Sequence, residues 1–77
     1  MRRFTLLEAC EETGVDRQFV VRCLRARWVN PAFPGNSELD EADLARLRLI
    51  ATLREDFGVN DEAVPLILHL VDQLHEK

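Results

Sequence analysis

Helix-start signals recur along the chain and divide it into short helical segments. Thr5 and Glu8 match a capping box, in which a hydroxyl accepts the N–H three residues on and a carboxylate reaches back. Asp16, Asp40 and Asn60 each stand directly before a stretch of helical periodicity, a position where helix N-caps favour such residues. We therefore expect four helices, one beginning at each of these signals.

Each expected helix ends at a breaker and carries an apolar stripe. Gly14 and Gly58 are placed to end the first and third helices in the left-handed conformation. Pro65 lies inside the fourth, where it either kinks the helix or marks its first turn. The stripe of the third helix is expected to reach Phe57, with Leu49 on the polar side. The stripe residues, at helical spacing, are Leu6, Ala9, Cys10, Phe19, Val20, Cys23, Leu24, Leu44, Leu47, Ile50, Ala51, Leu53, Val64, Ile67, Leu68, Val71 and Leu74.

The arrangement of the first two helices is typical of a helix-turn-helix, because a glycine-containing turn of about four residues joins them. The following residues, 26–39, include Pro31 and Pro34 and cannot sustain a helix. Residues 37–39 are expected to pair back as a short strand and form a small wing. We therefore predict an all-α winged helix-turn-helix with four helices and a minimal β-hairpin, as a single domain over residues 1–77.

Composition and charge favour a binding or regulatory module over an enzyme. A chain of 77 residues has little to spare for the walls of a substrate pocket. No nucleophile–base pair, phosphate loop or paired-carboxylate site can be assembled from its residues. The net charge of −4 divides unevenly, with six arginines against four acids in residues 1–37 and four cations against ten acids in residues 38–77. The acidic half is expected to repel nucleic acid and attract a basic partner.

Neither a membrane nor a metal partner is indicated. The sequence has no apolar run near the roughly 18 residues that a membrane span needs and no signal-peptide core, so we expect a cytoplasmic protein. Cys10 and Cys23 lie on apolar stripes and are expected to pack in the core. His69 and His75 point about 120° apart on one helix at about 100° per residue, a spacing that does not chelate a metal. No cofactor is expected.

Two helix faces carry candidate binding residues. One of them is the exposed face of the expected helix that begins after Asp16. Gln18, Arg22 and Arg25 line up with Val21 on its exposed side, and arginine and glutamine are base-reading side chains. This face is a candidate for DNA binding. The alternatives are a solvated face whose arginines pair with acids of the first helix, and a protein contact.

The second candidate face is on the fourth helix, which is more apolar than one small core requires. Leu66 and Leu70 widen its stripe to an arc of roughly 200°, where about 100° suffices for packing on a core. A surplus of this kind points to a protein partner or a homodimer contact. The carboxylates expected to contribute to a partner contact are Asp56, Asp61, Glu62 and Asp72.

The segments FTLLEACEETGVDRQFVVRCLRARWVNP and LDEADLARLRLIATLREDFGVNDEAVPLIL resemble the opening and the next two helices of MerR-type winged helix-turn-helix domains. DNA-binding members usually carry an arginine–tyrosine pair in the second helix and a glycine–tyrosine–arginine wing. This chain has no tyrosine, and the wing position offers Glu38, Asp40 and Glu41. These departures argue against DNA binding.

The stretch GVNDEAVPLILHLVDQLHEK is similar to the final helix of chaperone modulatory proteins of the CbpM type, a branch of the same superfamily. The resemblance implies binding to the J-domain of a DnaJ-like (CbpA-type) co-chaperone and inhibition of its stimulation of Hsp70. J-domains present a basic helix, which exposed carboxylates would attract. The alternative function is a small MerR-type or excisionase-like DNA-binding transcriptional regulator.

Overall fold

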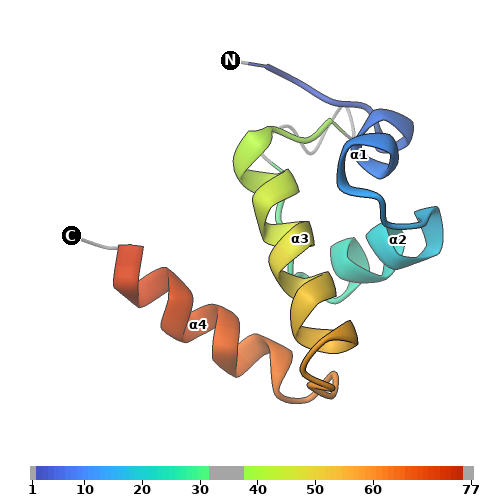
Figure 1. Cartoon of the computed structure of the whole chain (residues 1–77). Helices are drawn as coiled ribbons and strands as arrows, with labels where there is room; N and C mark the ends of the chain where they lie inside the picture. The colour runs from blue at the N-terminus through green and yellow to red at the C-terminus, as the bar shows by residue number, and fades with distance from the viewer. Residues whose placement is uncertain (1, 32–37, 76–77) are drawn as a thin grey trace.

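The computed structural model describes residues 2–31 and 38–75, which form an all-α fold (Figure 1). Two short helices come first, and the longest helix lies between them and the last one. The last helix leans away, so that its C-terminal end is far from the first two. The helices are α1 (Leu6–Thr13), α2 (Arg17–Arg25), α3 (Glu41–Glu55) and α4 (Val64–His75).

The expected caps start the first three helices. In α1, the Thr5 hydroxyl accepts the Glu8 N–H at 3.2 Å and the Glu8 carboxylate accepts the Thr5 N–H at 2.9 Å. Asp16 accepts an N–H of α2 at 2.7 Å. Asp40 and Asp43 form the same reciprocal pair at the start of α3, at 2.9 and 3.0 Å. These local bonds satisfy N–H groups that have no partner inside a helix.

The end of α2 uses an arginine where glycine is usual. Arg27 has a φ of 62°, in the left-handed region. The Trp28 N–H donates to the Cys23 carbonyl at 3.0 Å and the Arg27 N–H donates to the Leu24 carbonyl at 3.2 Å. This bond pair defines a Schellman motif, which turns the chain sharply out of the helix. At the end of α1, glycine takes this role as expected, with Gly14 at a φ of 78°.

The fourth helix starts later than Asn60, the expected N-cap. Gly58 has a φ of 64° and follows α3 as expected. Asn60 caps a single turn over residues 61–63, and the regular helix begins at Val64. Pro65 is then its second residue, where the missing N–H costs no intrahelical bond. Of the two alternatives for this proline, the position in the first turn is the one found.

The buried core largely follows the expected stripes, although Leu53, Ile67 and Val71 are only half-buried and three other residues differ more clearly. Phe57 is 73% exposed because α3 ends at Glu55, two residues before it. Leu49 packs partly buried against the core, so the buried side of α3 is wider than its apolar stripe predicts. Leu74 is 72% exposed at the C-terminal end of α4. The core cluster comprises Phe4, Ala9, Val20, Cys23, Trp28, Val29, Leu39, Leu44, Leu47, Ile50, Val64 and Leu68.

The expected β-hairpin wing is not supported. Within residues 2–31 and 38–75, β-type pairing consists of an isolated antiparallel bridge between Phe4 and Leu39, with N–H···O distances of 2.7 and 2.9 Å. The segment after the irregular stretch therefore pairs with the N-terminal arm, because both of these side chains are buried there. Residues 32–37, which include most of the expected wing, lie outside the described residues.

In the described ranges, every helix is too short or too polar to cross a membrane.

Candidate functional site

The basic face of α2 is exposed, as its periodicity predicts. Gln18, Arg22 and Arg25 lie on it, and Val21 is half-buried between them. Together with Arg17 they line a shallow hollow of about 570 Å³. A basic helix face with a hollow suits an extended anionic ligand or the side chains of another protein.

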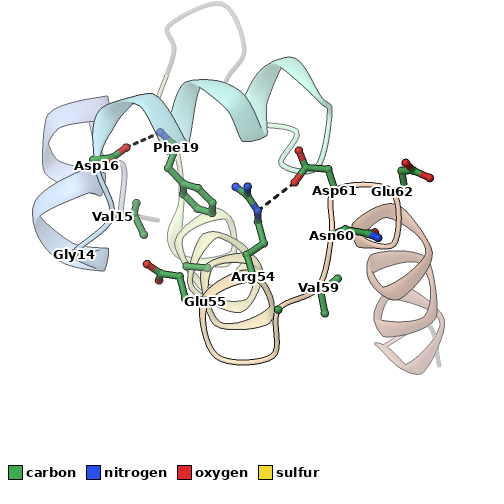
Figure 2. A pocket seen from close by; sticks show the side chains of 12 residues that line it. Gly14, Val15, Asp16, Phe19, Arg54, Glu55, Val59, Asn60, Asp61 and Glu62 are labelled. Atoms are coloured by element: carbon green, nitrogen blue, oxygen red, sulfur yellow. Dashed lines mark hydrogen bonds and ion pairs between the residues drawn. The ribbon is translucent and has the colours of Figure 1, made fainter.

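Arg22 makes an ion pair that the sequence does not predict. Its guanidinium pairs with the Asp61 carboxylate, in the turn before α4. Arg54 of α3 approaches the other carboxylate oxygen, with 3.2 Å between Nε and Oδ1 (Figure 2). The Arg54 guanidinium also lies 5.7 Å from the centre of the Phe19 ring. We call Arg22, Arg54 and Asp61 the Asp61 cluster. A candidate DNA-binding residue and a candidate partner-binding residue thus contact each other.

A groove of about 790 Å³ runs beside this cluster, between the α1–α2 turn, the end of α3 and the turn before α4 (Figure 2). Its apolar part includes Val15, Phe19 and Val59. Arg54 is the single cation among its lining residues. The carboxylates that line it are Asp16, Glu55, Asp61 and Glu62. Outside the Asp61 cluster, the charged residues that line the groove are all carboxylates, so this part of the groove suits a cationic side chain.

Leucines form an exposed row along α4. Leu66 is 62% exposed, Leu70 is 52% exposed and Leu74 is 72% exposed. They are spaced four residues apart, so they lie on one side of the helix. The opposite side holds Val64 and Leu68, which are buried. We call Leu66, Leu70 and Leu74 the leucine row. Three large exposed apolar side chains on one helix face are typical of a contact surface.

The Asp72 carboxylate forms an ion pair within the domain. Arg46 of α3 donates to both of its carboxylate oxygens, at 2.7 and 3.2 Å, and also donates through Nε to the Trp28 carbonyl. The hydrogen bonding from Arg46 lowers the pKa of Asp72 below its ordinary value. The Asp72 side chain remains 51% exposed, so water screens the pair and its contribution to stability is small. The pair links α4 to α3.

The two remaining candidate carboxylates are exposed. Asp56 caps the C-terminal end of α3, and Glu62 lies in the turn before α4. Neither belongs to an ion pair between described residues. The expected set of partner-binding carboxylates therefore divides into two that pair internally and two that face solvent.

Both cysteines are free thiols. Cys23 is fully buried, and burial raises its pKa to about 11. Cys10 is half-buried and packs against the core. The expectation that both serve core packing is confirmed. Across residues 2–31 and 38–75, no three His, Cys, Asp or Glu side chains are grouped to hold a metal.

A protein-family model described as MerR HTH family regulatory protein matches residues 4–77. The match covers all four helices and the turn between α1 and α2. Neither the curated proteins nor the solved structures give a significant match to the chain.

Proposed function

The chain belongs to the family of MerR HTH regulatory proteins, and from this premise we propose that it works by binding another protein. The proposed partner is the J-domain of a DnaJ-like (CbpA-type) co-chaperone. Binding would block the J-domain from stimulating Hsp70. The similarity of the last twenty residues to the final helix of CbpM-type modulators supports the choice of partner.

The observation that carries this proposal is the leucine row. Leu66 and Leu70 are more than half exposed, although α4 already buries Val64 and Leu68 on its other side. Covering each of these two leucines with a partner would contribute about 1–2 kcal/mol, given their present exposure. The two leucines would thus supply about 2–4 kcal/mol of the roughly −8 kcal/mol that corresponds to the micromolar affinity expected of a small interface.

Charge complementarity favours a basic partner helix. The acidic groove and Glu62 lie next to the N-terminal end of α4, where the leucine row begins. A cationic helix that covers Leu66 can therefore place its positive side chains near these carboxylates. Complementary charges of this kind speed association and fix the orientation of the partner.

The DNA-binding alternative is favoured less. Arg22, one of its candidate residues, is paired with Asp61. The chain carries a net charge of −4, whereas affinity for a phosphate backbone depends on positive charge. Arg25 and Gln18 still lie exposed beside the hollow on α2. Recognition of a DNA major groove by these two residues is therefore the second candidate function.

The test is a calorimetric titration with the isolated J-domain of the DnaJ-like protein from the same cell. The double variant Leu66→Gln with Leu70→Gln should bind at least about thirtyfold more weakly. Leu7→Gln is the matched control, because Leu7 is 71% exposed but lies on α1. In parallel, the J-domain-stimulated ATPase activity of Hsp70 should fall when the wild-type chain or the Leu7→Gln variant is added. Unchanged affinity of the double variant would refute the proposed surface.

A further inference from the structure

The Asp61 cluster has the form of an occupied anion site. Arg22 comes from α2 and Arg54 from α3, and each guanidinium meets a different oxygen of the same carboxylate. Figure 2 shows the Arg54 side of this cluster. Guanidinium groups recognise carboxylate and phosphate oxygens with the same fork of N–H donors. A phosphate in place of the carboxylate would therefore find both donors already facing it.

The surroundings of the cluster extend this anion site along α2. Arg17 and Arg25 are exposed on the same hollowed face as Arg22, and neither belongs to an ion pair between described residues. The Asp61 carboxylate places a negative charge against Arg22, which lies between Arg17 and Arg25 along α2. Because it contacts both guanidinium groups, it also takes the position in which a phosphate would meet them.

We propose that Asp61 is an internal competitor that blocks a phosphate-binding site formed by Arg22 and Arg54. With the carboxylate in place, the basic face of α2 binds the backbone of duplex DNA weakly. With the carboxylate withdrawn, Arg22 and Arg54 join Arg17 and Arg25 to bind it. This inference rests on the ion pairs alone, so it holds or fails separately from the proposed binding of a J-domain.

The position of Asp61 allows such a withdrawal. It is the first residue of the turn that leads into α4, and it is not part of a helix. Its two ion pairs are partly exposed, with side-chain exposures of 53% for Arg22 and 27% for Arg54. Partly exposed pairs of this kind contribute little to stability, so the cluster can open without unfolding the domain.

The experiment measures binding to a short, labelled DNA duplex of mixed sequence by fluorescence anisotropy over a series of salt concentrations. Asp61→Asn should bind roughly five- to tenfold more tightly than the wild type at low salt. Its slope of log K against log salt should be steeper by up to about 2, because each phosphate contact adds about 0.9.

The matched control is Asp72→Asn. It also removes one carboxylate that pairs with an arginine, but it releases Arg46 between α3 and α4 and leaves the α2 face unchanged. Its affinity should stay near that of the wild type. Adding Arg22→Gln to Asp61→Asn should abolish the gain, whereas Arg22→Gln alone should have little effect because Arg22 is already engaged.

Two results would overturn the proposal. The first is equal binding by Asp61→Asn and the wild type. The second is an equal gain in Asp61→Asn and Asp72→Asn, since that gain would reflect net charge alone. Circular dichroism checks that each variant is folded, and Asp61→Ser replaces Asp61→Asn if the amide variant is not, because serine is well tolerated in turns.

Discussion

Two leucines of α4, two residues apart, offer a direct comparison between its two faces. Leu66 is 62% exposed and Leu68 is 3% exposed. At about 100° per residue they point in nearly opposite directions. Replacing each by alanine makes the same chemical change in the same helix. The difference between their effects on the free energy of unfolding therefore measures how much the burial of each side chain contributes.

The structure sets the expected sizes. Leu68→Ala removes a side chain from the core cluster, and such changes cost about 2–5 kcal/mol of unfolding free energy. We expect about 2–3 kcal/mol here, because α4 lies at the edge of the core and the site can partly collapse. Leu66→Ala should change stability by less than about 0.5 kcal/mol, because the side chain is mostly in water and alanine favours helix.

Urea unfolding followed by circular dichroism measures both values. In thermal unfolding of a domain of this size, the expected loss for Leu68→Ala corresponds to a fall in Tm of roughly 8–24 °C. Leu66→Ala should melt within a few degrees of the wild type and should bind the J-domain more weakly. An equal loss of stability in the two variants would refute the reasoning. It would mean that Leu66 is buried in the folded domain, and the proposed function would lose the observation that carries it.

Four further predictions concern single groups. Glu62→Lys should slow association with the J-domain in stopped-flow measurements at low salt, since it reverses an exposed charge beside α4, and a rate unaffected by the change would count against the acidic contact. Arg27→Gly should raise the unfolding free energy by about 0.5–1 kcal/mol, because glycine adopts the left-handed conformation without strain; a loss of stability would contradict this account of the α2 terminus. The raised pKa of Cys23 means that its contribution to stability is complete below pH 9.0 and is lost as the pH rises towards about 11, by about 1.4 kcal/mol per pH unit; urea titrations of a Cys23→Ala variant should lack this slope. The lowered pKa of Asp72 means that its pairing is complete above pH 3.8 and is lost only in stronger acid, and NMR titration of its carboxyl should show the pKa rising towards its ordinary value in Arg46→Gln.

The helix starts could be predicted from the sequence because caps are local. Thr5, Asp16 and Asp40 bond to N–H groups within three residues, so spacing alone identifies them. The exposed face of α2 and the excess leucines of α4 followed from helical periodicity in the same way. The similarity to MerR-type domains over nearly the whole chain agreed with the family match.

Two features of the structure could not be predicted from the sequence because they depend on contacts between distant segments. The pairing of Phe4 with Leu39 joins two segments that lie far apart in the chain, and no local rule relates them. The Asp61 cluster likewise depends on how the turn before α4 meets α2, so Arg22 and Asp61 were assigned to separate surfaces. Arg27 was missed for a different reason, because the rule for helix ends looks for glycine and this helix ends without it.

The sparse attachment of α4 has a consequence for how the domain fluctuates. Val64, Leu68 and the Asp72–Arg46 pair hold this helix, while its last turn extends beyond the core. Backbone amides near His75 should therefore exchange with solvent deuterium long before those of α3, through fraying that leaves the rest folded. A protein that covers Leu70 and Leu74 would suppress this fraying. Recognition at α4 would then be coupled to the ordering of its last turn, and would release more heat and lose more entropy than the docking of a rigid helix.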